Sequence, residues 1–273
     1  METSPEIGKT IEAGGIKTNL HDLGSGSPIL LIHGSGPGVT AWANWRLLMP
    51  ELAKKFRVIA PDMVGFGYTD RPAGIQYTMD NWMAHALGVL DALKLDKVGL
   101  VGNSFGGALA LHLANKAPDR FSRVVLMGAV GVHFEMTEGL DKAWGYTPSF
   151  ENMREIVNFF AFNKSLINDA LIESRYKASI RPGVQEAWAA MFPAPRQRWI
   201  ELMALPEEKI RALPQEFLIF HGREDQIIPV ACSEKLFGLI NRAQLHLFGR
   251  CGHWTQIEHA ARFNRMVSEF FSE

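Results

Sequence analysis

Short, mostly apolar runs alternate with longer stretches of helical periodicity along most of this 273-residue chain. Between the second and third runs, Met79, Trp82, Met83, Ala86 and Leu90 recur at the spacing of one helix face. Six runs have the length and composition of strands buried on both faces of a sheet: residues 29–32, 57–60, 98–101, 124–127, 217–220 and 245–248. Strands that alternate with helices in this way predict an α/β fold with a mostly parallel sheet and right-handed crossovers.

The two ends of the chain extend this pattern. Residues 7–23 contain two short strand-like segments separated by glycines at 14 and 15, which predicts an antiparallel edge to the sheet. Residues 42–52 are predicted to form a helix. The last helix is amphipathic, and its apolar side includes Phe263, Val267 and Phe270.

The pattern changes in the middle of the chain. Residues 132–213 contain no clear buried strand, and Pro193, Pro195 and Pro206 separate segments that are helical in pattern. This predicts a helical cap at 132–213, inserted between the two parts of an α/β core at 1–131 and 214–273. The cap is rich in large aromatics, most of which should form its own core and some the wall of a pocket: Trp144, Tyr146, Phe159, Phe160, Phe162, Trp188, Phe192 and Trp199.

Composition narrows the class of protein. A hydrophobic share of 47% and a charged share of 21% suit a soluble globular enzyme. The net charge is −1 without basic clusters, so we expect a small-molecule partner rather than nucleic acid or an anionic membrane. No signal-peptide core or apolar run of membrane-spanning length occurs, which makes the cytoplasm the expected location. Cys232 and Cys251 match no metal motif and are expected to be reduced thiols, with no metal bound.

The strongest chemical signal is the turn at residues 102–106, where Ser104 stands between Gly102 and Gly106. A strand precedes this turn and a helical pattern follows it. That is the context of the G-x-S-x-G nucleophile elbow, whose glycines let the backbone turn sharply and leave the serine exposed above the sheet. We therefore predict that Ser104 is a nucleophile.

A glycine-rich loop follows the first buried strand at residues 33–38 (HGSGPG). A loop without bulky side chains can turn a backbone N–H toward a carbonyl oxygen held above Ser104, so it is a candidate oxyanion hole. It is not a dinucleotide fingerprint, because Val39 stands where that motif needs its last glycine. His33 is expected to be structural rather than a catalytic base.

Two further side chains complete a candidate catalytic triad. Asp225 and His253 each follow a predicted strand, and the order serine, acid, histidine is that of the α/β-hydrolase fold. Serine needs a histidine to take its proton, and the histidine needs a carboxylate to fix its tautomer. Glu224 is the alternative acid, and His259 is the alternative base.

The whole chain resembles the meta-cleavage product hydrolases, which hydrolyse a carbon–carbon bond in ring-fission products of catechols. The resemblance rests on six motifs: HGSGPG (33–38), PDMVGFG (61–67), GNSFGG (102–107), WGYTP (144–148), GREDQIIP (222–229) and GRCGHWTQIEH (249–259). It is closest to the branch that acts on monocyclic products. It implies the α/β-hydrolase fold, no cofactor, a homo-oligomeric state, and a 2-hydroxy-6-oxohexa-2,4-dienoate with hydrogen or a small alkyl group at C6.

The resemblance also assigns further residues. It implies that Ser35 and Phe105 donate backbone N–H groups to the oxyanion. Arg175 would bind the substrate carboxylate through its guanidinium, with Arg181 as the alternative. The resemblance implies this set for binding the substrate: Gly36, Asn44, Asn103, Arg175 and Trp254.

Several alternatives stay open from the sequence. A carboxylesterase would use the same triad without a carboxylate-binding arginine, a ligand receptor would keep the fold without turnover, and a relative with a larger pocket would accept 6-phenyl substrates. His253 is the expected carrier of the proton that C5 must receive before the bond breaks. Whether Ser104 then attacks C6 itself or activates water is not decided by the sequence.

Overall fold

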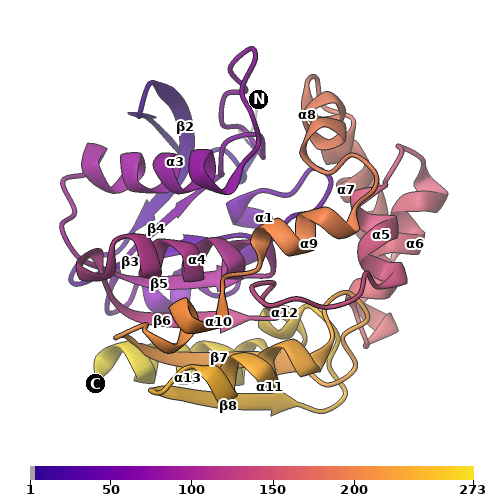
Figure 1. Cartoon of the computed structure of the whole chain (residues 1–273). Helices are drawn as coiled ribbons and strands as arrows, with labels where there is room; N and C mark the ends of the chain where they lie inside the picture. Colours follow the sequence, from indigo (N-terminus) through magenta and orange to yellow (C-terminus); the bar gives the residue numbers. More distant parts are fainter. Residues whose placement is uncertain (1–3) are drawn as a thin grey trace.

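An eight-stranded sheet runs through the computed structural model, which describes residues 4–273 (Figure 1). The strand order is β1-β2-β4-β3-β5-β6-β7-β8. β1 and β2 are antiparallel to their neighbours, and β3 to β8 are parallel, which confirms the predicted mostly parallel sheet with an antiparallel edge. The strands are β1 Lys9–Ala13, β2 Ile16–Leu23, β3 Pro28–Ile32, β4 Arg57–Pro61, β5 Val98–Asn103, β6 Phe121–Met127, β7 Glu216–Gly222 and β8 Ala243–Phe248.

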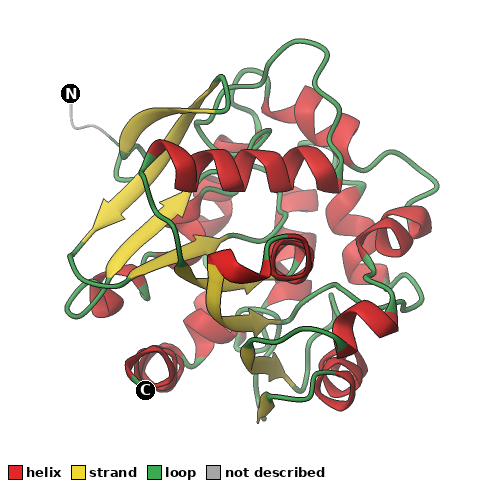
Figure 2. Ribbon diagram, turned by 60° about the vertical axis from the view of Figure 1, so that its left-hand side comes forward, coloured by secondary structure: helices red, strands yellow, loops and turns green. Residues whose placement is uncertain are grey.

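Helices cover both faces of this sheet (Figure 2). Because successive residues of a strand point to opposite faces, Leu30 and Ile32 of β3 pack into one core layer and Ile29 and Leu31 into the other. The first layer contains α3 Met79–Ala92, α4 Phe105–Lys116 and α11 Val230–Leu239. The second contains α1 Ala41–Trp45, α2 Met49–Leu52 and α13 Ala260–Ser272, and a short α12 Thr255–Glu258 precedes α13.

The single helix predicted for residues 42–52 is wrong. The chain forms two short helices there, α1 and α2, and Pro50 lies in the first turn of the second. Proline lacks the N–H that a continuing helix needs, and its ring clashes with the preceding turn. The break keeps Trp45 and Leu52 buried against the same side of the sheet.

Among the described residues, the segment between β6 and β7 contains helices and no strand. Residues 138–191 lie at one end of the sheet, and residues 197–211 run back across α4 (Figure 1). The aromatic side chains of this segment pack mainly on one another, with the rings of Trp144 and Phe192 stacked at 4.5 Å and Trp188 5.3 Å from Phe192. No described helix combines the length and the apolar character needed to cross a bilayer. The elements are α5 Glu138–Trp144, α6 Phe150–Phe160, η2 Lys164–Leu166, α7 Asp169–Ser179, α8 Val184–Met191, α9 Gln197–Met203 and α10 Glu207–Arg211, and η1 Pro118–Arg120 lies earlier, before β6.

Residues 4–8 are held against the sheet by one buried asparagine. Asn19 of β2 donates from Nδ2 to the Glu6 carbonyl (3.0 Å) and accepts at Oδ1 from Gly8 N–H (2.8 Å). The same Nδ2 also donates to Asp62 Oδ2 (2.8 Å). These bonds fix the backbone on both sides of the Glu6 side chain, so residues 4–8 have a defined place against β2.

Candidate active site

Ser104 occupies the sharp turn between β5 and α4. Its φ of 55° and ψ of −114° lie outside the regions that side chains favour, as expected for a nucleophile elbow. A Cβ on Gly102 would collide with the backbone of Gly106, and one on Gly106 would collide with the backbone of Ile32. The turn is also tied to β6, because Ser104 N–H donates to the Met127 carbonyl (2.9 Å). Both glycines are therefore required by close backbone contacts.

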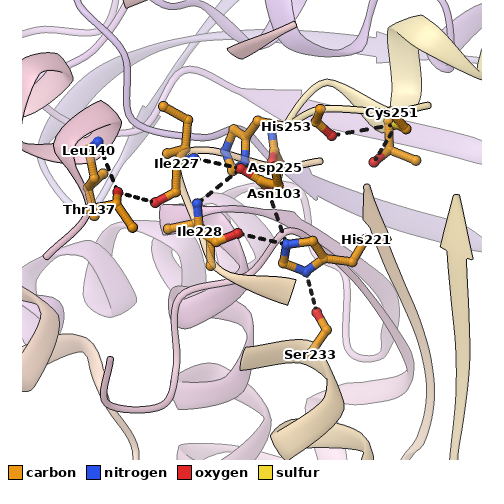
Figure 3. A network of polar contacts seen from close by, with 12 residues as sticks. Asn103, Thr137, Leu140, His221, Asp225, Ile227, Ile228, Ser233, Cys251 and His253 are labelled. Atoms are coloured by element: carbon orange, nitrogen blue, oxygen red, sulfur yellow. Dashed lines mark hydrogen bonds and ion pairs between the residues drawn. The ribbon is translucent and has the colours of Figure 1, made fainter. Parts of the chain in front are cut away.

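The predicted acid and base lie side by side at the carboxyl ends of β7 and β8 (Figure 3). His253 Nδ1 is 2.7 Å from Asp225 Oδ2, and both side chains are about as buried as the core, at 2% and 1% exposure. The other carboxylate oxygen, Oδ1, accepts from the N–H groups of Ile227 (2.8 Å) and Ile228 (3.0 Å). The geometry brings together the two residues that the sequence placed 28 positions apart.

Asp225 is held as an anion. Burial acts to raise the pKa of Asp225, but the charge of His253 and the hydrogen bonds from His221 and His253 outweigh it and hold that pKa well below its usual value. A carboxylate in this state can fix the imidazole tautomer and stabilise its cation. The ring nitrogen that faces the cavity is then Nε2.

The alternative acid and base are engaged elsewhere. Glu224 accepts from Cys251 N–H (3.0 Å) and pairs with Arg223 (2.7 Å). His259 stacks on the ring of Phe248 at 4.7 Å. Neither side chain is bonded to a member of the candidate triad in the part of the chain that the structure describes.

Ser104 and His253 line the same cavity. Within residues 4–273 no hydrogen bond joins Ser104 Oγ to His253 Nε2, and such contacts commonly tighten only when substrate binds. The end of α6 also holds this histidine in place. The backbone N–H of His253 donates to the Phe160 carbonyl (2.7 Å), and the Phe160 ring lies 5.5 Å from the imidazole. The histidine is therefore oriented by both Asp225 and the end of α6.

The two candidate oxyanion donors flank the nucleophile. Phe105 is the first residue of α4, so its N–H lies among the groups that a helix leaves without an internal partner. Ser35 lines the cavity in the loop after β3. Its hydroxyl accepts a hydrogen bond from Trp144 Nε1 (3.0 Å), so the side chain ties this loop to α5. His33 is buried and accepts from Met63 N–H at Nε2 (3.0 Å), and the structural role predicted for it is confirmed.

The cavity beside Ser104 has a volume of about 670 Å³. That volume is ample for a small organic substrate. Of the aromatic residues expected in the helical segment, Phe160 alone appears among the described lining residues. Apolar lining comes largely from α6, α7, the loop after β8 and α12: Met153, Ile156, Val157, Phe160, Leu171, Trp254 and Ile257.

Two buried amides on the cavity wall have unused hydrogen-bonding atoms. Asn103 Nδ2 donates to Asn44 Oδ1 (2.8 Å), and that oxygen also accepts from Gly34 N–H (3.2 Å). Asn44 Nδ2 and Asn103 Oδ1 have no protein partner among the described residues. Both atoms are shielded from solvent in this structure, so a polar ligand would pair with them after a small movement of the amides, and that pairing would remove the cost of a buried polar group without a partner. One offers a donor and the other an acceptor.

Three charged side chains share the same cavity. Arg175 lies 2.9 Å from Glu6, with exposures of 17% and 15%. Arg46, which the sequence analysis missed, also lines the cavity and donates to the Ala43 carbonyl. Burial lowers the pKa of Arg46, the charge of Arg175 lowers it further, and Glu6 acts in the opposite direction. The cavity therefore holds two cations and one internal carboxylate.

Gly36 and Trp254 also line the cavity, and the Trp254 ring stacks on Phe160 at 5.5 Å. Arg181, the alternative to Arg175, is absent from the described lining, and its guanidinium lies 3.9 Å from the centre of the Tyr68 ring. Residues 4–273 contain no group of three His, Cys, Asp or Glu side chains placed to bind a metal. Cys232 and Cys251 are free and buried.

Comparison with known proteins gives the same fold and narrows the family. Residues 27–260 match the family model described as the alpha/beta hydrolase fold. The chain is 63% identical to 2-hydroxymuconate semialdehyde hydrolase of Pseudomonas sp. strain CF600, over 100% of this chain and 96% of that protein. It is 60% identical to 2-hydroxy-6-oxo-2,4-heptadienoate hydrolase of Pseudomonas putida, over 98% and 97%.

A solved structure has nearly the same backbone arrangement as this chain. The meta-cleavage product hydrolase CumD of Pseudomonas fluorescens IP01, a serine-to-alanine variant complexed with acetates, superposes with a TM-score of 0.97 at 58% identity over 98% of both chains. Fold, full-length identity and superposition agree. The chain belongs to the α/β-hydrolase fold family and, within it, to the meta-cleavage product hydrolases, which are carbon–carbon bond hydrolases.

Proposed function

We propose that this enzyme hydrolyses the C5–C6 bond of 2-hydroxy-6-oxohexa-2,4-dienoates that carry hydrogen or a small alkyl group at C6. The products are 2-hydroxypenta-2,4-dienoate and a small carboxylic acid. The substrates that name the two relatives at 63% and 60% identity support this size class. The triad, the oxyanion donors and the binding set are part of the same proposal.

The observation that carries the proposal is the wall of the Ser104 cavity. An ester needs only a nucleophile and an oxyanion hole, whereas a dienoate also presents a carboxylate and a 2-hydroxyl or 2-keto group. Arg175 and Arg46 supply cations for the carboxylate. The unpartnered atoms of Asn44 and Asn103 supply a donor and an acceptor for the oxygen at C2. Gly36 and Trp254 complete this half of the cavity.

The chemistry follows from the poor leaving ability of carbon. The dienol first becomes a ketone: the 2-hydroxyl loses its proton and C5 gains one, carried by His253. Ser104, or water that Ser104 and His253 activate, adds to the C6 carbonyl while Ser35 and Phe105 N–H groups stabilise the oxyanion. When the C5–C6 bond breaks, its electrons pass into the conjugated ketone, and the enolate oxygen at C2 takes up a proton to give the dienol product. If Ser104 is the nucleophile, water then hydrolyses the resulting acyl-enzyme and releases the carboxylic acid; if water adds directly, the acid forms in the same step.

The test is direct, because ring-fission products are yellow. Purified enzyme is mixed with the products of catechol, 3-methylcatechol and 2,3-dihydroxybiphenyl, and loss of visible absorbance is followed. We expect rapid decay with the first two and the matching carboxylic acids as products. Turnover of simple esters with no decay of any dienoate would instead indicate a carboxylesterase.

The proposal also covers the division into cap and core, the location, the oligomeric state and the affinity for nucleic acid. We assign residues 132–213 as the cap and 1–131 with 214–273 as the core, because the helices between β6 and β7 supply much of the apolar wall of the cavity. We further propose a cytoplasmic location and a homo-oligomeric state, the latter supported by the family resemblance. The net charge of −1 without basic clusters supports a lack of affinity for nucleic acid. Light scattering of the purified enzyme, with and without added DNA, measures both the oligomeric state and that affinity.

A further inference from the structure

A second histidine contacts the catalytic acid, and the mechanism above does not use it. His221 is the penultimate residue of β7 and is fully buried. Its Nε2 lies 2.9 Å from the Ile228 carbonyl and 3.2 Å from Asp225 Oδ2. Its Nδ1 lies 2.7 Å from Ser233 Oγ of α11 (Figure 3). The ring thus connects the acid loop to the helix that follows it.

The partners of His221 define its protonation state. A carbonyl oxygen only accepts, so the nitrogen beside Ile228 must carry a proton. The Ser233 hydroxyl has no other hydrogen-bond partner in the described part of the chain, and it is free to donate to Nδ1. Both ring nitrogens are then satisfied by a neutral imidazole that carries its proton on Nε2.

Few charged groups other than His253 surround the Asp225 carboxylate. Its carboxylate accepts from two backbone N–H groups and from His253 Nδ1, and its Oδ2 lies 3.2 Å from His221 Nε2, whose N–H also faces the Ile228 carbonyl. Burial raises the pKa of the nearby thiols Cys232 and Cys251 to about 12, so both are neutral under working conditions. Glu224 is bonded to Arg223 and to a backbone N–H. Among residues 4–273, His253 is the group in contact with Asp225 that gains a positive charge in the proposed mechanism.

We propose that His221 is a positioning residue, which fixes the Asp225 carboxylate through a neutral hydrogen bond and leaves its negative charge to stabilise the His253 imidazolium. The proposal rests on the triad in the proposed function. It does not involve substrate binding, because His221 is not among the described residues that line the cavity. Its signature is therefore a change in kcat and in pH dependence at nearly constant KM.

Two substitutions separate the hydrogen bond from the packing of the ring. His221→Leu fills the space without a donor, whereas His221→Gln places an amide N–H near the position of Nε2. We expect His221→Leu to lower kcat by roughly 10- to 100-fold, as for loss of a hydrogen bond to a charged group, with KM within about twofold of the wild type. His221→Gln should stay within about threefold of wild-type kcat.

The pH profile gives the decisive readout. The N–H dipole of His221 points its positive end at Asp225 and toward His253, so its removal makes the His253 imidazolium easier to form. The acidic limb of kcat/KM should then move to higher pH by roughly 0.3–1 unit in His221→Leu and stay in place in His221→Gln. An unmoved limb in His221→Leu, or an equal loss in both variants, would make His221 a packing residue and overturn the proposal.

A matched control is available in His85 of α3. That ring is equally buried and contacts a hydroxyl, Thr18 Oγ1 (2.8 Å), and the N–H of Val64 (3.1 Å). Burial lowers its pKa to about 4, so it is neutral in the assay range. His85→Leu should lower thermal stability and leave the acidic limb in place.

One measurement does not depend on how well the leucine variant folds. In wild-type enzyme labelled with ¹⁵N-histidine, one imidazole absent from the His221→Gln spectrum should carry its proton on Nε2 and none on Nδ1 at the pH of the assay. A proton on Nδ1 of that ring would contradict the proposal even if the wild type cleaves dienoates. Failure to cleave any dienoate, with the ring protonated on Nε2 as expected, would contradict the proposed function alone.

Discussion

The Glu6 carboxylate lies 2.9 Å from the Arg175 guanidinium, across 169 positions of sequence and inside the cavity that contains Ser104. Both side chains are mostly buried, so their interaction is weakly screened by solvent. An incoming substrate carboxylate must replace Glu6 as the partner of Arg175 or share the guanidinium with it. If Arg175 binds the substrate carboxylate as proposed, Glu6 is an internal competitor for the anionic end of the substrate.

Removal of the Glu6 charge is expected to strengthen binding of anionic substrates. Glu6→Gln should lower KM for a dienoate by roughly 3- to 10-fold, about 0.6–1.4 kcal/mol, and leave a neutral ester such as p-nitrophenyl acetate unchanged. Steady-state kinetics on both substrates measure this. Glu173→Gln removes an exposed carboxylate from α7, paired with Lys177, and is the control. A rise in KM for the dienoate would mean that Glu6 orients Arg175 rather than competing for it.

Removal of the Arg175 charge should have the opposite effect to removal of the Glu6 charge: it should weaken binding of dienoates and leave neutral esters little changed. Arg175→Gln is expected to lower kcat/KM for dienoates. The loss should correspond to roughly 2–5 kcal/mol of transition-state binding, the usual cost of losing one partner of a buried charge pair. The neutral ester should lose little, because it presents no carboxylate. Equal losses on both substrates would assign Arg175 a structural role and favour the carboxylesterase alternative.

The nucleophile and base are tested by truncation. Ser104→Ala should abolish turnover of the dienoate, with a loss of several orders of magnitude, and should still bind it, because the charged and amide groups of the cavity remain. His253→Ala should lose a comparable amount, since residues that act as one unit are not additive. Single-turnover absorbance measures both binding and cleavage. A Ser104→Ala enzyme with about a tenth of wild-type rate would exclude Ser104 as the nucleophile.

Features determined by short stretches of sequence were predictable. The buried strands depend on local apolar runs, and the elbow at Ser104 is marked by a short glycine-flanked motif between a strand and a helix. Pro50 was also visible in the sequence, and its position could have predicted the break between α1 and α2.

Features determined by tertiary contacts were not. The Glu6–Arg175 pair depends on how residues 4–8 dock against Asn19, which no local pattern encodes. The place of Arg46 in the cavity likewise depends on which segments far apart in sequence form the cavity. His221 offered a signal that was overlooked. It ends an apolar run four residues before the acid, which places a polar ring at the same sheet edge as Asp225.

An ion pair outside the active site should make part of the folding stability depend on pH in the acid range. Asp22 of β2 binds Arg57 of β4 through two hydrogen bonds of 3.0 and 3.1 Å. The hydrogen bond from Arg57 lowers the pKa of Asp22, against a smaller opposing effect of burial, and charge from Arg57 and Lys9 lowers it further. A lowered folded pKa means that the stabilisation is complete above the unfolded value of about 3.9 and is lost as pH falls through the folded value.

Asp22→Asn should therefore destabilise the enzyme at neutral pH and not in strong acid. Because the pair is partly exposed, we expect about 1 kcal/mol at pH 7, or a Tm lower by about 2–4 °C. Thermal melts across pH 2.5–7 measure the difference, which should shrink toward zero at the acid end. A difference that persists unchanged in acid would show that the effect comes from packing rather than from the charge.

Phe160 is expected to limit the size of the C6 substituent. It lines the cavity and lies against both the His253 imidazole and the Trp254 ring. A small apolar subsite discriminates by about 1–3 kcal/mol per methylene when it is underfilled, and more strongly when overfilled, because packed side chains resist displacement. In the wild type, kcat/KM should therefore change gradually from methyl to hydrogen and fall abruptly from alkyl to phenyl.

Truncation at Phe160 should remove that limit. Phe160→Ala is expected to raise the ratio of kcat/KM for phenyl over methyl substrates by roughly 10-fold or more, about 1.4 kcal/mol, and the ratio is unaffected by any uniform loss from altered support of His253. Phe159→Ala deletes the neighbouring ring, which packs on the core and is not among the described cavity residues, and should leave the ratio unchanged. A wild-type enzyme that processes phenyl within about threefold of methyl would contradict the small-substituent assignment and leave the triad assignment intact, because the nucleophile, acid and base do not depend on what occupies C6.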